Sequence, residues 1–177
     1  LGISREPWII ALIYLGYPSV LEVHSNACWI TNMDDHSSMT GWVFLLKGGA
    51  ISWASKKQMC ITNSTMEYEF VTLHFVGKEA EWLRSLVYDI HLWSKPIAPI
   101  SIRCDNVVAL GKAYTPLCNN KRRNLGVRHS IVRELITRGV ISIEFVKSQH
   151  NLPDHLTKGL SRDKLHKSII RMGLISI

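Results

Sequence analysis

The sequence predicts an α/β fold, in which helices flank a mixed β-sheet, and three observations support this prediction. Gly48 and Gly49 separate two apolar runs, a strong signal for a β-hairpin because glycine readily adopts the positive φ angles of hairpin turns. Apolar residues then recur every three or four positions over residues 66–91, the pattern of a long amphipathic helix. Beyond that helix, short apolar runs alternate with helical patterns, as in a mixed sheet whose strands are joined through helices.

The first part of the chain is predicted to be mostly extended. Strands are predicted at Ile9–Leu15, Val20–Ile30, Gly41–Lys47 and Ala50–Ser55. A Gly-Tyr-Pro-Ser sequence at 16–19 breaks the first run, and residues 31–38 are polar and acidic, which predicts a loop. The strand at Gly41–Lys47 is apolar on both of its faces.

The remainder is predicted to alternate between helices and strands. Helices are predicted at Met66–His91, Val107–Tyr114, around Ile131–Ile136, after Pro153 and at Ser161–Met172, with strands at Ile100–Cys104 and Val140–Val146. Ser64 and Thr65 are candidate caps for the long helix, with Glu67 in its first turn, and two prolines follow its end. Gly139 stops the basic helix before the last strand.

Composition indicates an ordinary globular domain of 177 residues. Hydrophobic residues make up 46% and charged residues 20%, which excludes disordered, collagenous and coiled-coil classes. Four cysteines are scattered without the spacing of a zinc site, so we expect reduced thiols and an intracellular protein. The longest uncharged run, Pro7–Leu21, is too short to span a membrane.

Positive charge is concentrated at one end of the sequence. The net charge is +7, and from Asn120 onward 12 basic residues stand against four acidic ones. The first 119 residues carry nine basic and ten acidic side chains. This asymmetry fits a polyanionic partner such as nucleic acid, and a solvated basic surface is the alternative on charge alone.

Carboxylates at the ends of predicted elements are the candidates for chemistry, because phosphate-loop, hydrolase and zinc-protease motifs are absent from the sequence. Glu67 and Glu69 lie in the first turn of the long helix, Asp105 ends a buried strand, and Asp154 opens a helix after the last strand. Such residues can converge at one edge of a sheet and bind Mg²⁺, which prefers oxygen ligands. Taken singly, each also has a structural explanation as a helix-terminal acid or a turn residue.

Several motifs in order resemble the ribonuclease H region of copia-type retrotransposon Pol polyproteins. They are Tyr17–Glu22, Thr40–Leu46, Gly48–Gln58, Ser64–Glu69, Lys78–Leu83, Arg103–Asn106, Arg128–Ser130 and Asp154–Lys158. The resemblance covers nearly the whole chain from about residue 14. It implies a tail of the preceding reverse-transcriptase connection at 1–13 and a ribonuclease H-like domain at 14–177. We read the sequence as a fragment of a longer chain.

The resemblance implies a five-stranded ribonuclease H-like sheet and hydrolysis of the RNA strand of RNA–DNA hybrids with two Mg²⁺ ions. It implies catalytic and metal-binding roles for Glu69, Asp105 and Asp154, with Glu67 as the reserve for Glu69. Nucleic-acid binding is predicted for the basic residues Lys121, Arg122, Arg123 and Arg128. The implied partners are the hybrid and a reverse-transcriptase domain of a longer polyprotein, in a cytoplasmic particle or the nucleus, and no membrane.

The chain departs from the family pattern at its first acidic position. Asn26 stands where relatives carry the bridging Asp, and an amide offers one neutral oxygen in place of an anion. Asn124 stands where many relatives carry His. We therefore expect an eroded copy with impaired hydrolysis and weakened Mg²⁺ binding. The alternatives are a non-catalytic nucleic-acid-binding remnant and a protein-interaction domain. His150 is a minor candidate for proton transfer, and a solvated loop residue is the alternative.

Overall fold

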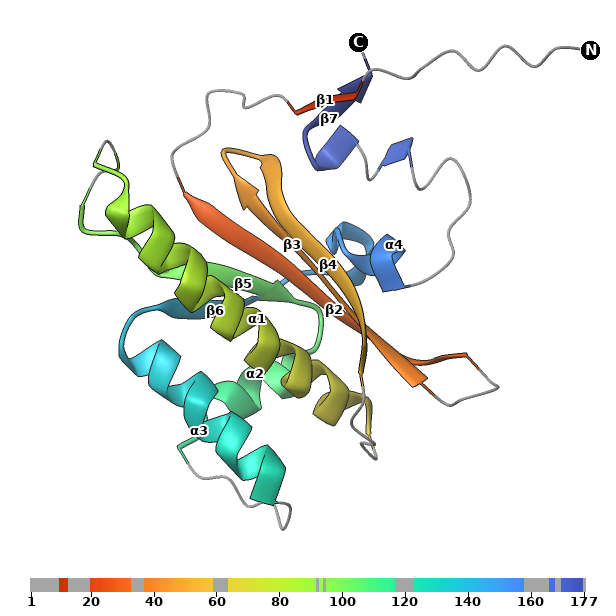
Figure 1. Ribbon diagram of the computed structural model, residues 1–177. Helices are drawn as coiled ribbons and strands as arrows, with labels where there is room; N and C mark the ends of the chain where they lie inside the picture. The colour runs from red at the N-terminus through yellow and green to blue at the C-terminus, as the bar shows by residue number, and fades with distance from the viewer. Residues whose placement is uncertain are drawn as a thin grey trace, which may run out of the picture.

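Five strands form one mixed sheet, and helices lie on both of its faces (Figure 1). This computed structural model describes residues 10–12, 20–32, 37–58, 64–91, 93, 95–116, 123–157, 166–167 and 170–176, with the backbone alone for 10–12, 29–32, 37, 123–124, 154–155 and 174–176. The strands of the sheet are β2 (Leu21–Asn32), β3 (Ser37–Leu46), β4 (Gly49–Gln58), β5 (Ile100–Cys104) and β6 (Ile141–Phe145). The helices are α1 (Thr65–Asp89), α2 (Val107–Tyr114), α3 (Arg123–Thr137) and α4 (Asp154–Thr157), with a 3-10 turn at Ser148–His150.

The strand order is β4-β3-β2-β5-β6. β2, β3 and β4 form an antiparallel meander, whereas β5 pairs in parallel with β2 and β6 in parallel with β5. This arrangement confirms the predicted mixed sheet, because the meander precedes α1 and each later strand follows a helix. β2 is therefore the central strand, with an antiparallel neighbour on one side and a parallel neighbour on the other.

The β3–β4 hairpin confirms the predicted strand pair but shifts its turn by one residue. The turn residues are Lys47 and Gly48, whose φ angles are 52° and 78°, and Gly49 already pairs with Leu46. A hydrogen bond of 3.0 Å from the Ala50 N–H to the Met172 carbonyl also holds the start of β4. Lys47 consequently adopts the left-handed conformation that the sequence pattern assigned to a second glycine.

The predicted ends of several strands are wrong; β4, for example, ends at Gln58 and not at Ser55. β2 continues to Asn32 and β3 begins at Ser37, so the predicted loop at 31–38 is shorter, and residues 33–36 lie outside the described part. The predicted strand at Ile9–Leu15 is described as β1 (Ile10–Leu12), which pairs with β7 (Leu174–Ser176) in a separate two-stranded sheet. Most of the predicted helix at 161–172 lies outside the described residues.

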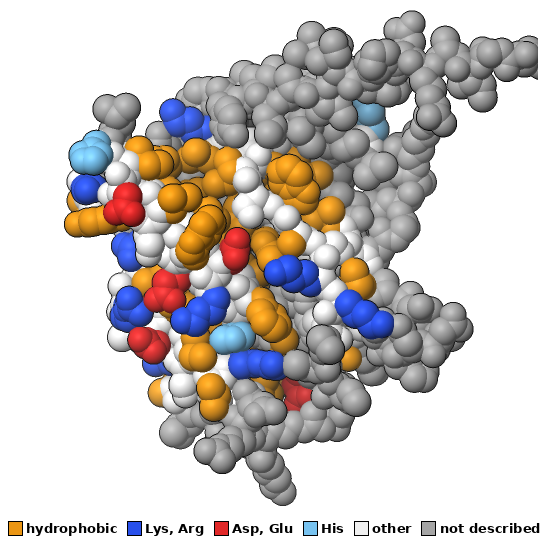
Figure 2. Space-filling model, viewed as in Figure 1, with side chains coloured by type: hydrophobic (Ala, Val, Ile, Leu, Met, Phe, Trp, Pro, Cys, Tyr) orange, Lys and Arg blue, Asp and Glu red, His pale blue; other side chains and the backbone are white. Residues whose placement is uncertain are grey.

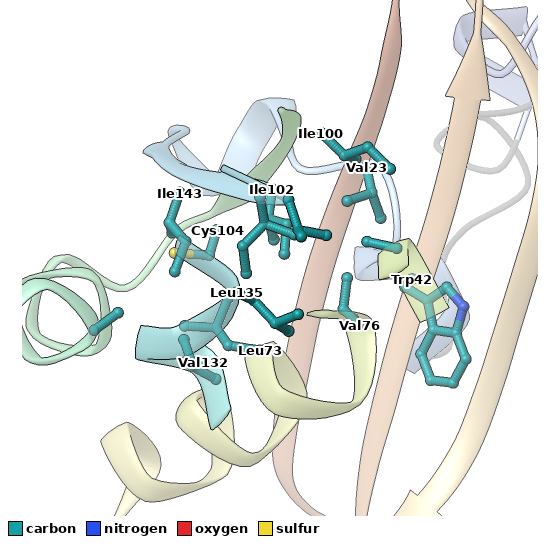
Figure 3. Close-up of a cluster of buried hydrophobic side chains, with 14 of the residues drawn as sticks. Val23, Trp42, Leu73, Val76, Ile100, Ile102, Cys104, Val132, Leu135 and Ile143 are labelled. Atoms are coloured by element: carbon teal, nitrogen blue, oxygen red, sulfur yellow. The ribbon is translucent and has the colours of Figure 1, made fainter. Parts of the chain in front are cut away.

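The two faces of β3 enter two different hydrophobic clusters, in line with its apolar pattern. On one face Trp42 and Phe44 belong to the main core beneath α1. Figure 3 shows this core, with Trp42 labelled together with Leu73, Val76 and Leu135. On the other face Val43 and Leu45 pack with buried residues of the C-terminal segment, namely Leu152 and Met172. Burial on both faces therefore accounts for the unbroken apolar run Trp42–Leu45 in β3.

Helix boundaries follow the predicted local signals. The Ser64 side chain accepts a hydrogen bond of 3.3 Å from the Glu67 N–H and caps α1, and Asn106 caps α2 by accepting one of 2.9 Å from the Ala109 N–H. Gly139, with φ of 64°, follows α3 where the sequence predicted a stop. α1 ends at Asp89, two residues before the predicted end at His91. No described helix combines the length and the apolar character needed to cross a bilayer.

A buried histidine on β2 should make stability depend on pH. Burial, together with the nearby Arg103 and Arg171, lowers the pKa of His24 from 6.5 to about 4. Between pH 6.5 and 4 the unfolded state binds a proton that the folded state excludes, so the free energy of unfolding should fall by about 3 kcal/mol as pH drops through this window. Urea unfolding at several pH values measures the loss.

His24→Gln should flatten this dependence in part. His74 contributes a slope of the same sign, because burial and the nearby Arg128 and Lys78 lower its pKa as well. An unchanged pH dependence in His24→Gln would show that His24 is not the source.

Candidate active site

The position of Asn26 in the sheet brings it to the end of β5. Asn26 pairs with Gly41 of β3, and the parallel register of β2 with β5 pairs His24 with Arg103. Continuing that register by two residues places Asn26 beside Asp105, the first residue after β5. Asn26 is 3% exposed, whereas Asp105 is half-buried. Parallel pairing therefore brings together two of the predicted site residues, which are far apart in sequence.

Glu69 reaches the same strand from α1. Its side chain is 4% exposed, and Oε1 accepts a hydrogen bond of 3.2 Å from the N–H of Ala27, the residue after Asn26. Glu67 is half-buried, and its N–H bonds to the cap residue Ser64. Of the two candidate glutamates, Glu69 is thus the one that contacts β2.

The pKa of the Cys104 thiol reflects the negative charges in this region. This pKa is raised to about 11, mainly by burial and also by the negative charges of Glu69 and Asp105, against the lowering effect of a hydrogen bond to the Asn106 carbonyl. Both carboxylates therefore lie close enough to the Cys104 thiol to disfavour its ionisation. The site is a region of negative potential under a buried, protonated thiol.

Asn26 connects the site to α4. Its Nδ2 donates a hydrogen bond of 2.9 Å to Oγ1 of Thr157, and both residues are buried. Ser55 Oγ donates to the Leu156 carbonyl at 2.7 Å, and a Cβ at Gly41 would lie 2.8 Å from Cγ2 of Thr157. Glycine is required at position 41 because α4 packs directly on the backbone of β3.

Asp154 begins α4, one helical turn before Thr157. Its backbone is therefore held next to β2 and β3, as expected for a residue that joins the cluster at this sheet edge. Its carboxylate lies outside the described side chains, so the predicted proximity of the Asp105 and Asp154 carboxylates stays a prediction.

The donors that are described do not fit two cations. Glu69 and Asp105 supply carboxylates, but residue 26 supplies a neutral amide whose NH₂ group is directed at Thr157. Among the side chains described, no group of three or more His, Cys, Asp or Glu is placed to hold a metal ion. We therefore assign no hydrolytic step to bound cations in the chain as it stands.

The predicted basic residues are only partly described. Lys121 and Arg122 lie outside the described residues, and Arg123 and Asn124 begin α3 with backbone alone. Arg128 lies on α3 with its guanidinium 5.9 Å from the centre of the Phe75 ring on α1. His150 is exposed in the 3-10 turn. The roles assigned to all these residues stay predictions.

Two polar networks around the site were not predicted. Gln58 Nε2 donates to Thr40 Oγ1 and, at 3.0 Å, to Thr72 Oγ1, which ties β3 and β4 to the part of α1 that carries Glu69. Asn151 Nδ2 donates at 2.8 Å to the Ser25 carbonyl, which fixes the segment before α4. Gln58 belongs to a motif that resembles the ribonuclease H region. The hydrogen-bond partners of Gln58 depend on tertiary contacts, which the sequence does not show.

Removing the hydroxyl of Thr157 should destabilise the domain. In Thr157→Val the buried Nδ2 of Asn26 loses an acceptor while the methyl against Gly41 is kept, so we expect a loss of about 1–3 kcal/mol in urea unfolding. Thr157→Ser keeps the hydroxyl and is the matched control. Equal stability of the Val variant and the unmodified chain would mean that this hydrogen bond does not hold α4.

Comparison with known proteins by sequence finds Pol polyproteins of plant transposons. The chain is 29% identical over 163 residues to the retrovirus-related Pol polyprotein from transposon TNT 1-94 of Nicotiana tabacum, which covers 91% of this chain and 12% of the relative. It is 28% identical over 167 residues to that from transposon RE1 of Arabidopsis thaliana, which covers 93% of this chain and 11% of the relative. The chain thus spans only a small part of these relatives. No family model matches it.

Solved structures with the same fold are ribonuclease H domains. The ribonuclease H1 of Halobacterium salinarum has a TM-score of 0.54 at 17% identity and covers 83% of this chain and 98% of its own. A second, LC11-RNase H1 in complex with an RNA/DNA hybrid, has a TM-score of 0.56 at 12% identity over 77% of this chain and 93% of its own. A foamy viral protease-reverse transcriptase in complex with an RNA/DNA hybrid has a TM-score of 0.50 at 16% identity, over 94% of this chain and 22% of its own. The motif resemblance to the ribonuclease H region of copia-type Pol polyproteins is thus confirmed: the chain is related in sequence to plant retrotransposon Pol polyproteins and has a ribonuclease H-like fold.

Proposed function

We propose that this chain is a retrotransposon Pol-derived ribonuclease H-like domain that binds RNA–DNA hybrids and whose hydrolysis of the RNA strand is impaired by Asn26. The observation that supports the proposal is the buried amide of Asn26, hydrogen-bonded to Thr157, on β2 next to the residue whose N–H donates to Glu69. The family resemblance implies a bridging carboxylate at this position. Hybrid binding is supported by the basic C-terminal third of the sequence and by the two similar structures that contain a hybrid.

The impairment follows from the chemistry of the amide. A carboxylate at residue 26 would present an anion to cations shared with Glu69 and Asp105, whereas an amide presents one neutral oxygen and two N–H donors. One donor is committed to Thr157. A cation between Glu69 and Asp105 would therefore lack one of its anionic ligands, and we propose that Mg²⁺ binds weakly here.

Asn26→Asp should restore hybrid cleavage. With a labelled RNA strand and Mg²⁺, the unmodified chain should cleave very slowly, and the variant at least 100-fold faster, because each tenfold step corresponds to about 1.4 kcal/mol of transition-state stabilisation. Asn26→Asp combined with Asp105→Asn is the matched control and should return to the low rate. Calorimetric titration with Mg²⁺ gives an independent readout, with tighter binding in Asn26→Asp.

Two results would change the proposal. Robust Mg²⁺-dependent cleavage by the unmodified chain, abolished by Asp105→Asn, would show that three carboxylates suffice and that Asn26 does not impair the site. An inactive Asn26→Asp variant that still binds hybrids would favour the alternative, a non-catalytic nucleic-acid-binding remnant. The observation that supports this alternative is the hydrogen bond from the Asn26 amide to Thr157, because it uses the side chain for structure and not for a metal ion.

We also propose the context of a longer polyprotein. The relatives by sequence are about ten times longer than the matched segment, so a reverse-transcriptase domain is the proposed neighbour. The pairing of β1 with β7 connects the proposed connection tail at 1–13 with the end of the chain. The proposed location is intracellular, in a cytoplasmic particle or the nucleus.

Removing the charges of Arg122 and Arg123 should weaken hybrid binding in a salt-dependent way. If both Arg122 and Arg123 contact phosphates, replacing both with Gln should reduce the slope of log affinity against log salt by about two units. Fluorescence anisotropy with a hybrid duplex over a range of NaCl concentrations measures the slope, and Lys47→Gln in the distant hairpin turn is the control. An unchanged slope in the double variant would mean that the two arginines do not contact phosphates and are ordinary solvated surface residues.

A further inference from the structure

Three cationic side chains are held over aromatic rings around the first half of α1. The ammonium of Lys56 lies 5.2 Å from the centre of the Trp42 ring, and that of Lys112 lies 5.7 Å from the centre of the Phe70 ring. Arg128 lies over Phe75 in the same half of the helix. Figure 2 shows this face, where Lys and Arg side chains alternate with hydrophobic ones.

Lys56 lies in the same row of the sheet as Ala27, the β2 residue that Glu69 contacts. Lys56 pairs with Thr40, and Thr40 pairs with Ala27, whose N–H donates to Glu69. Neighbouring strands are about 4.8 Å apart, so Lys56 and Ala27 are about 10 Å apart across the sheet. Trp42 is 4% exposed whereas Lys56 is exposed, so a buried ring supports a surface cation.

Lys112 of α2 packs on the residue that follows Glu69 in α1. Phe70, the ring beneath its ammonium, directly follows Glu69 in α1. The Lys112 carbonyl is 3.0 Å from Nε2 of His129, whose ring stacks on Phe70 with centroids 5.8 Å apart. The backbone and the side chain of Lys112 are therefore both fixed against the helix turn that carries Glu69.

These two lysines are not neutralised by carboxylates. Other cations of the described surface form ion pairs, namely Lys78 and Arg138 with Glu81, and Arg103 with Glu22. Among the residues described, no carboxylate lies within ion-pair distance of Lys56 or Lys112. Each is thus a positive charge packed on an aromatic ring, Lys56 from β4 and Lys112 from α2.

We propose that Lys56 and Lys112 bind backbone phosphates of the RNA–DNA hybrid next to the first half of α1, which carries Glu69. An ammonium provides charge and donors without reading base edges, which suits a duplex recognised by its backbone and shape. Aromatic support fixes each side chain before binding and so reduces the rotamer freedom lost in the complex. This inference rests on the proposed function, because it assumes that the chain binds hybrids.

Lys95 provides a matched control within the same chain. Its ammonium lies 4.1 Å from the centre of the Tyr88 ring, so it makes the same kind of contact. Tyr88 lies near the C-terminal end of α1, about 28 Å along the helix from Glu69. A general effect of cation–aromatic packing or of net charge would affect Lys95 as much as Lys56 and Lys112.

Salt-dependent binding of the full chain to a hybrid duplex, measured by anisotropy without Mg²⁺, tests the inference. Lys56→Gln and Lys112→Gln should each reduce the slope of log affinity against log salt by about 0.9, and the double variant by about 1.8. Lys95→Gln should leave the slope unchanged. Lys56→Arg keeps the positive charge and should also have the slope of the unmodified chain. Urea unfolding of each variant identifies any loss of folding.

Failure of the inference and failure of the proposed function give different results. If the unmodified chain shows no salt-dependent binding to the hybrid, the proposed function fails, and this inference with it. If the unmodified chain binds but the double variant keeps its slope, the proposed function stands and the inference is overturned. An equal reduction by Lys95→Gln would also overturn it, because the effect would then be one of net charge.

Discussion

Burial of the central strand β2 on both of its faces is the constraint on which the rest of the structure depends. Val23 faces the main core beneath α1, whereas His24 and Asn26 face the side covered by the C-terminal segment. The strand also pairs antiparallel with β3 and in parallel with β5. A shift of its register by one residue would exchange these two sets of side chains, so the position of the candidate site is fixed by the packing of the whole sheet.

The same burial favours a neutral side chain at residue 26. A carboxylate at 3% exposure, near two others, is costly to bury unless a cation balances the charge. A neutral amide removes that repulsion and makes a buried hydrogen bond to Thr157 instead. Substitutions that relax a strained or charged site commonly stabilise a protein while reducing its activity. A chain without selection for cleavage would retain such a residue readily.

Local signals predicted most elements, whereas long-range partners escaped prediction. The capped start of α1, the whole of α2 and the stop at Gly139 depend on residues within a few positions of each boundary. The resemblance assigned Asn26 and Asp105 to one site, and the parallel pairing of β2 with β5 brings these two residues together. The one-residue shift of the hairpin turn and the Asn26–Thr157 bond depend on pairing across the fold, which a local pattern does not contain. The resemblance identified the motif that includes Thr157 but not what its hydroxyl contacts.

The pairing of β1 with β7 has a consequence for the order of folding. It joins Ile10 with Ser176, nearly the largest separation that this sequence allows, through two strands of three residues each. Closing so long a loop has a high entropic cost, and so few backbone hydrogen bonds return little until the main sheet has brought the ends together. The two-stranded sheet should therefore form last and open first, as a small cooperative unit that exchanges its amide hydrogens before the central strands do.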